Sequence, residues 1–385
     1  MKRWMCIAVI GLVLSGFGFA QLSVSGQFQY GVLSNFDDAP GLGWDNQLIF
    51  TQKIDSFNTA TVRLRLRNYD SSRTLTSGTA GIQNEWADFW LLSSDAPFVD
   101  RAYLTTDVTG ALGVKGPVKY VLTSGFAYVS TADLTDGISP FEVADLDSDN
   151  FVAMGGGKQA VFSNVLTIAD AWNLRFAVAP NDFSQGVGGW FVSADGSLSV
   201  GPGTLYPEVV FSANNGVTAD KGNLIVAAKY TMEASGLSFA IVPQYLYALD
   251  SDAAVQYYYA VAAKVGYGEI ASVSAGFLGM DGSNANRMEA RLLLTPVKSA
   301  GIDIGAVFNL DKDMYVSPIT GKSSTLNDLD ISGFVMLGAT KVRLGYLYLG
   351  EEGYSSWINA DLTRIGNGGS ALKQGGMYFE VTVAF

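Results

Sequence analysis

Three aspartates at alternate positions, Asp145, Asp147 and Asp149, have a spacing that could support metal chemistry. Alternate carboxylates can chelate a hard cation such as Ca²⁺. A calcium-binding EF-hand loop starting at Asp145 would need glycine at its sixth position and glutamate at its twelfth, where this chain has Asn150 and Gly156. The spacing is therefore a weak indication of calcium, and we predict no metal site and no cofactor.

A second chemical motif is the run from Gly155 to Lys158, which imitates the end of a phosphate-binding loop. That loop requires Ser or Thr after the lysine and glycine at its first position, whereas this chain has Gln159 and Val152 there. We interpret the run as a flexible loop that leads into a strand.

Enzymatic chemistry is poorly supported. The chain contains no histidine, so hydrolases with a Ser-His pair and barrel proteases with an Asp-His pair would lack their base. A pair of carboxylates could still act together, but nothing in the sequence places two of them side by side. We predict that the protein is not an enzyme.

Arginines occupy the alternate positions Arg63, Arg65 and Arg67, and this spacing indicates the kind of secondary structure that carries them. Between them lie apolar residues such as Leu64 and Leu66, and this period-2 alternation is typical of a strand with one polar and one apolar face. The same alternation recurs along almost the whole chain beyond residue 21. The polar faces include Arg287, Glu289 and Arg291 in one segment, and Lys341 and Arg343 in another.

The first twenty residues predict a secretory signal peptide. Lys2 and Arg3 precede an apolar run from Ile7 to Phe19, and the small residue Ala20 precedes the expected cleavage site. The alternative is a membrane anchor helix, but the run is shorter than the roughly 20 residues needed to span a bilayer. Residues 1–20 would be removed, and with them Cys6, the only cysteine, so the exported chain would have no disulfide.

Composition narrows the class of the exported chain. Without Lys2 and Arg3, the 24 basic residues become 22 against 36 acidic ones, a net charge of −14 that argues against a nucleic-acid partner. Charged residues make up only 16% of the chain, yet no apolar stretch after the signal peptide approaches the length of a membrane helix. Two options remain: a large buried core, or strands whose apolar faces contact lipid.

The alternating segments predict eighteen strands between residues 21 and 385. They are 22–31, 45–54, 59–69, 100–108, 111–129, 158–168, 171–180, 187–194, 197–213, 222–232, 236–248, 253–267, 269–280, 286–296, 300–310, 329–338, 341–349 and 376–385. The connections alternate between long loops and links of four residues or fewer, and the longest loops are 70–99, 130–157, 311–328 and 350–375. An up-and-down barrel with short periplasmic turns and long external loops produces this order. We therefore assign 83–92 to an external loop, because an extra strand there would reverse the alternation. An inward fold or a short helix over the same residues would fit the sequence equally well.

A soluble all-β protein with a dry core would also contain many alternating strands. The last strand favours a membrane barrel, because Phe379, Val381, Val383 and the final Phe385 resemble the signal by which the outer-membrane assembly machinery recognises its substrates. An arginine facing lipid near the midplane costs about 2–4 kcal/mol, so the three alternating arginines must face the lumen. We predict an all-β fold: a closed antiparallel transmembrane β-barrel of about 18 strands, with 16 as the alternative.

The whole exported chain resembles bacterial outer-membrane porins. The resemblance rests on the signal peptide, the alternating strands, the long and short connections and Phe385, together with strand-then-turn units such as 101–106 followed by 107–110. It implies an outer-membrane channel for passive diffusion of small polar solutes and ions. It also implies export through the periplasm, contact with outer-membrane lipid and a homotrimer.

In porins one long loop commonly folds into the pore, with its acids facing a basic wall. The candidate loop is 130–157, with the acidic residues Asp133, Asp136, Glu142, Asp145, Asp147 and Asp149. The candidate basic wall consists of Arg63, Arg65, Arg67, Lys115, Lys119 and Arg175. Opposed charges would orient dipolar solutes and sort ions.

Two other functions stay open. One is a substrate-specific channel with aromatic guides, for which Trp86, Trp90 and Trp357 are candidates, although packing within the loops explains them more simply. The other is a structural or adhesive surface protein whose lumen is closed.

Overall fold

The computed structural model describes most of the strands and part of the loops. The described residues are 22–34, 41–67, 99–127, 131–141, 143–146, 159–179, 188–215, 222–250, 253, 255–281, 286–310, 325–349 and 375–385. The expected signal peptide at 1–20, the segment 83–92 and the tryptophans Trp86, Trp90 and Trp357 lie outside these ranges.

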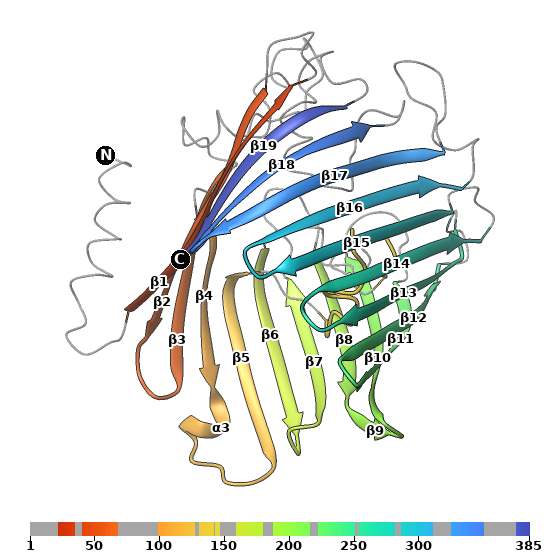
Figure 1. Ribbon diagram of the computed structural model, residues 1–385. Helices are drawn as coiled ribbons and strands as arrows, with labels where there is room; N and C mark the ends of the chain where they lie inside the picture. Colours follow the sequence, from red (N-terminus) through yellow and green to blue (C-terminus); the bar gives the residue numbers. More distant parts are fainter. Residues whose placement is uncertain are drawn as a thin grey trace, which may run out of the picture.

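Nineteen strands form one antiparallel sheet that closes on itself (Figure 1), because β1 pairs with both β2 and β19. Their bounds are β1 Leu22–Ser34, β2 Gly41–Lys53, β3 Asn58–Arg67, β4 Val99–Asp107, β5 Val118–Ala127, β6 Gln159–Ile168, β7 Trp172–Ala179, β8 Gly188–Gly196, β9 Leu198–Val200, β10 Gly203–Asn215, β11 Asn223–Ala234, β12 Leu237–Ala248, β13 Tyr257–Tyr267, β14 Ala271–Met280, β15 Arg287–Val297, β16 Ala300–Asn309, β17 Leu326–Leu337, β18 Thr340–Leu349 and β19 Gly375–Ala384. Closure leaves no sheet edge, which is what a strand-built membrane protein requires.

The short strand β9 continues β8 and does not begin a new crossing. Both strands pair with β10, β8 along Glu208–Asn215 and β9 along Gly203–Leu205. The barrel therefore has 18 crossings, and the predicted closed antiparallel fold is confirmed. The predicted turn at 195–196 is wrong, because the chain reverses at Gly201 and Pro202, where Gly201 adopts a left-handed φ of 57° and the proline has no N–H to donate to a ladder.

A second difference lies before β5, where a strand was predicted from residue 111. The one-turn helix α3 (Val108–Ala111) follows β4, and β5 begins only at Val118. Asp107 caps this helix: its Oδ1 accepts hydrogen bonds from the Gly110 N–H at 2.9 Å and the Thr109 hydroxyl at 2.8 Å. The connection is thus longer than the predicted tight turn at 109–110. Within the described ranges, no helix is both long and apolar enough to cross a membrane.

The two faces of the sheet differ as the alternation predicts. On β7, Trp172, Leu174 and Phe176 are exposed on the outer face, whereas Arg175 points inward to an acidic partner. Large apolar side chains are exposed on the outer face of most other strands as well, among them Val209, Val226, Tyr245, Tyr259, Val273, Ile302, Ile331, Leu344 and Phe379. An exposed apolar belt around a closed sheet is the surface that contacts hydrocarbon in a transmembrane barrel.

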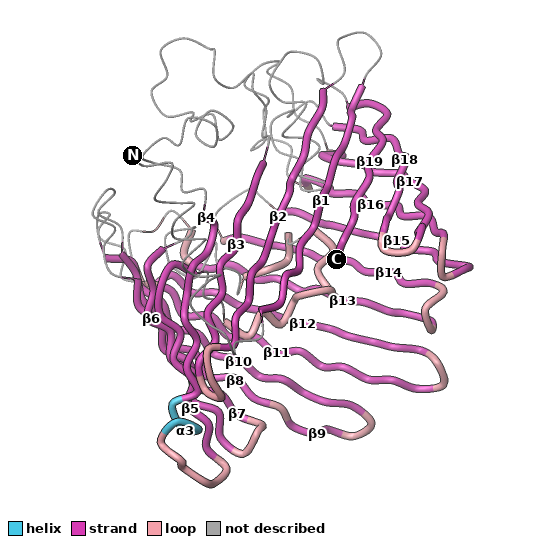
Figure 2. The backbone as a smooth tube through the Cα atoms, turned by 90° about the vertical axis from the view of Figure 1, so that its left-hand side faces the viewer, coloured by secondary structure: helices cyan, strands magenta, loops and turns pink. Residues whose placement is uncertain are grey.

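The first and last strands meet at a seam near the short turns. The Gly26 N–H donates to the Phe385 carbonyl oxygen at 2.9 Å, and the Phe385 N–H donates to the Gly26 oxygen at 3.2 Å. The rings of Phe28 and Phe385 lie 5.2 Å apart. Figure 2 shows the short turns at one end of the sheet, with α3 among them.

Candidate functional site

The segment 131–146, of which all but residue 142 is described, folds into the barrel and is called the inner segment below. Its apolar side chains are buried in one cluster with lumen-facing residues of the wall. From the segment come Leu134, Ile138, Val143, Ala144 and Leu146, and from the wall come Ile225, Ala227, Val242, Leu246, Ala260, Ala262 and Leu278, among others. Burial of this apolar surface at about 25 cal/mol per Å² holds the segment against β11–β14.

A single carboxylate on β15 fixes the middle of the inner segment. Glu289 is fully buried, and its Oε2 accepts hydrogen bonds from the N–H groups of Phe141 at 2.8 Å and Val143 at 3.4 Å. Its Oε1 accepts from the Ala144 N–H at 3.3 Å and from the Ser139 hydroxyl. Hydrogen bonds to a charged acceptor are about twice as strong as neutral ones, so Glu289 acts as the main latch of the segment.

Three further side chains of the wall bind the segment on either side of this latch. The Gln244 amide accepts from the Leu146 N–H at 2.8 Å and donates to the Ala144 oxygen at 3.1 Å. The Glu208 carboxylate accepts from the Ala132 N–H at 2.8 Å, and the Lys264 ammonium donates to the Gly137 oxygen at 2.8 Å. The segment is therefore fixed along its length to strands β10–β15.

Two glycines give the segment room to approach the wall. A Cβ atom at Gly276 would lie 2.2 Å from the Glu289 Oε1 and 2.7 Å from the Ala144 Cβ. A Cβ atom at Gly305 would lie 2.3 Å from the ring of Phe141. A side chain at Gly276 would therefore displace Ala144 or the Glu289 carboxylate, and one at Gly305 would require the Phe141 ring to move.

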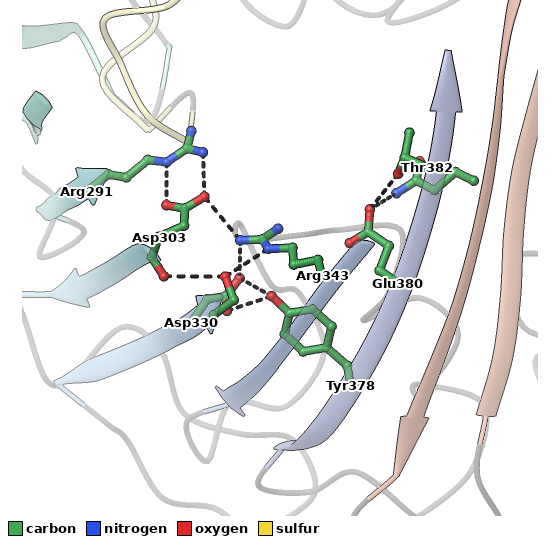
Figure 3. A network of polar contacts seen from close by, with 9 residues as sticks. Arg291, Asp303, Asp330, Arg343, Tyr378, Glu380 and Thr382 are labelled. Carbon is green, nitrogen blue, oxygen red and sulfur yellow. Dashed lines mark hydrogen bonds and ion pairs between the residues drawn. The ribbon is translucent and has the colours of Figure 1, made fainter. Parts of the chain in front are cut away.

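A network of charged side chains lines the wall next to the latch (Figure 3), on strands β15–β18. Asp303 accepts from the Nε of Arg291 at 2.8 Å and from its Nη2 at 2.7 Å, and Oδ2 also accepts from the Nη2 of Arg343 at 3.2 Å. The Nη2 of Arg343 also donates to the Oδ2 of Asp330 at 3.0 Å. Asp303 and Asp330 are almost fully buried, so each depends on these guanidinium partners.

The polar wall continues across β19 to β1. The Tyr378 hydroxyl donates to the Asp330 carboxylate, with distances of 2.9 and 3.0 Å to its two oxygens. On the same face of β19, the Glu380 carboxylate accepts from the Gln29 amide at 3.0 Å and from the Thr382 hydroxyl at 3.1 Å. The inner segment thus meets the wall through an apolar cluster and a few polar side chains, whereas the adjoining strands carry a hydrogen-bonded and charged surface.

The predicted basic residues lie at three different places. Arg63 lies on β3, where its Nη1 donates to the Gln47 amide oxygen at 3.5 Å, and Arg175 forms an ion pair with Asp195 at 2.8 Å. Lys115 lies in the connection after α3 and not in a strand as predicted, and Lys119 is exposed at the start of β5. The backbones of Arg65 and Arg67 belong to β3, opposite Gln47 and Asp45 of β2, but their side chains lie outside the description.

The predicted acidic residues of the loop are partly described. Asp133, Asp136 and Asp145 lie on the inner segment, whereas Glu142, Asp147 and Asp149 lie outside the described residues. The described contacts of the segment are with strands β10–β16. That the segment faces the arginines of β3 stays a prediction. The assembly role of Phe379, Val381, Val383 and Phe385 also stays a prediction.

Sequence reasoning missed the residues that hold the segment and line the charged wall. Glu289 and Arg291 were assigned to a polar face, but nothing in their spacing marks one as a latch and the other as part of a network. A usable signal was the presence of opposite charges on the polar faces of neighbouring strands. Arg291 on β15 pairs in register with Gly305 on β16, and Asp303 lies two residues before Gly305 on the same face. Gln244 and Glu208 gave no such signal, because their partners are backbone atoms of a distant loop.

A closed sheet with an apolar outer face, a polar lumen and a loop segment folded inside it defines a porin-like β-barrel of the outer-membrane type. No protein-family model matches the sequence, and no curated protein matches it. Among solved structures, a mutant porin of Rhodopseudomonas blastica is similar with a TM-score of 0.46 and 12% identity, over 95% of this chain and 100% of that one. OmpT, an outer membrane protein of Vibrio cholerae, is similar with a TM-score of 0.44 and 7% identity, over 95% and 98% of the two chains.

Proposed function

We propose that this protein is an outer-membrane porin, a passive channel for small hydrophilic solutes and ions, and not an enzyme. The observation that carries the proposal is the inner segment, latched by Glu289 to one part of the lumen wall next to the charged side chains of β15–β18. A barrel of 18 crossings is too wide for wall side chains alone to fill. A segment fixed inside such a barrel narrows the lumen, and charged residues beside it would favour polar solutes over apolar ones.

The proposal includes the surroundings of the channel. The exposed apolar belt would contact outer-membrane lipid, and the assembly machinery would recognise the last strand with its final Phe385. Subunits would associate as homotrimers through part of the belt. Chemical cross-linking of the protein in its native membrane, followed by electrophoresis, tests the trimer.

Planar-bilayer recording of the refolded chain from residue 21 tests the channel. We expect stepwise increases in current as single molecules insert, because the lumen is polar along β15–β19. A folded barrel that inserts without any conductance steps would contradict the proposal. That result would favour the alternative, a structural or adhesive surface protein with a closed lumen.

Replacement of Arg63, Arg65 and Arg67 by glutamine tests whether these residues line the pore. We expect the reversal potential in a salt gradient to shift towards cation selectivity, because three positive charges would leave the lumen. The control is Lys298→Gln, since the Lys298 side chain is 89% exposed in a short turn. An unchanged reversal potential in the triple variant would mean that the three arginines do not line the conduction path.

A further inference from the structure

A cavity of about 290 Å³ lies between the inner segment and the wall strands β13–β15. Its volume lies just below the range for small-molecule binding sites, about 300–1,000 Å³, which suits a solute of only a few heavy atoms. Its two sides carry opposite charges. The segment contributes the carboxylates of Asp133, Asp136 and Asp145, and the wall contributes the cations of Lys264 and Arg291.

The cationic side of this cavity is held in place by contacts already described. Lys264 is fixed at the rim, because its ammonium donates to the Gly137 oxygen at 2.8 Å. Arg291 uses its Nε and Nη2 for Asp303, so the Nη1 edge of its guanidinium is the one not engaged by that carboxylate. The Arg291 side chain keeps 35% of its surface exposed and lines the cavity.

The acidic side belongs to the inner segment, which the Glu289 latch fixes. Asp145 is almost fully buried, Asp133 is half-buried, and Asp136 is exposed in the lumen. Hydroxyl groups of Thr135 and Ser139 on the segment, and of Ser272 and Ser274 on β14, complete the polar lining. The cavity thus offers acceptors for a cationic group and donors for an anionic group within one small volume.

We propose that this cavity is a binding site for small zwitterionic solutes of the amino-acid type, which it would retain during passage. The solute's ammonium group would contact the carboxylates of the inner segment, and its carboxylate group would contact Lys264 and Arg291. None of the described residues that line the cavity has an aromatic side chain on which a sugar ring could stack. Retention during passage rests on the proposed porin function, whereas binding itself does not.

Solute binding to the folded barrel in detergent micelles tests the site directly. The probe is L-alanine, followed by broadening of its methyl NMR signal, with propionate and ethylamine as probes that keep only one of the two charges. We expect saturable broadening by alanine in the millimolar range, and affinity at least about tenfold weaker for each single-charge probe, since a hydrogen bond to a charged group is lost.

Two variants remove one charge from each side of the cavity. Asp136→Asn and Lys264→Gln should each weaken alanine binding by about tenfold. Asp136 is exposed, so its variant keeps the test valid even if Lys264→Gln disturbs the inner segment. The matched control is the double variant Glu269→Gln and Lys298→Gln, which removes an exposed ion pair between two short turns and should leave binding unchanged.

The outcomes separate the site from the channel. No saturable alanine binding, equal binding of ethylamine, or unchanged binding by Asp136→Asn would each overturn the zwitterion site, whatever the conductance. Alanine binding that both variants weaken supports the site, even if bilayer recordings find no channel. Bilayer recording of the same preparation decides the proposed function on its own.

Discussion

Glu289→Ala should release the inner segment from the wall and raise the single-channel conductance. The substitution leaves the N–H groups of Phe141, Val143 and Ala144 and the Ser139 hydroxyl without their acceptor. Each buried donor left unpaired costs about 1–3 kcal/mol, so the attachment of the segment loses several kcal/mol. Planar-bilayer recording measures the conductance, and limited proteolysis of folded protein tests whether the segment becomes accessible to cleavage.

Two other variants test the same attachment in different ways. Glu289→Gln keeps the shape and one acceptor oxygen, so its conductance should lie between those of wild type and Glu289→Ala. Gly305→Leu places a side chain where the Phe141 ring lies and should displace the segment without touching the latch. If conductance and proteolysis stayed at wild-type values in both Glu289→Ala and Gly305→Leu, the segment would not set the width of the pore.

Arg343→Leu should strongly destabilise the barrel. The arginine pairs with Asp303 and Asp330, and both carboxylates are buried. Removing one partner of a buried ion pair costs about 3–5 kcal/mol, because a charge is left without compensation. The measurement is a urea series on protein in detergent, in which electrophoretic mobility separates folded from unfolded barrel.

A double variant shows whether the loss of stability comes from a buried carboxylate left without its arginine partner. Arg343→Leu combined with Asp330→Leu removes the cation together with one buried carboxylate, and Asp303 keeps Arg291. We expect the double variant to unfold at a higher urea concentration than Arg343→Leu alone, since replacing a buried pair by apolar residues is often neutral. Equal midpoints for the single and double variants would mean that the loss arises from packing of the arginine stem.

The fold followed from the sequence because the membrane imposes a simple rule. Residues that face hydrocarbon must be apolar and their neighbours need not be, so Leu174 and Phe176 on one side and Arg175 on the other define a face without further information. The long and short connections then gave the order of crossings. The errors lay at Gly201–Pro202 and at α3, where local capping and turn geometry decided the structure within an otherwise alternating pattern.

The candidate site was less accessible to sequence reasoning. The loop 130–157 was identified from its length and acids, but its attachment depends on backbone N–H groups that meet Glu289 and Gln244 from more than ninety residues away. Such contacts produce no pattern in the sequence, because almost every residue carries the same backbone N–H donor. The glycines at 276 and 305 also gave no indication that the segment packs against them, since glycine is common along the chain.

The pairing of Gly26 with Phe385 also bears on how the molecule forms. Every other neighbouring pair of crossings joins segments that follow each other in sequence, whereas this one joins opposite ends of the polypeptide. Contacts between distant residues form slowly, because the entropy of closing the intervening chain is lost before they contribute. Completion of the ring should therefore be a late step in assembly, and until then two bare strand edges would be open to pairing with another polypeptide.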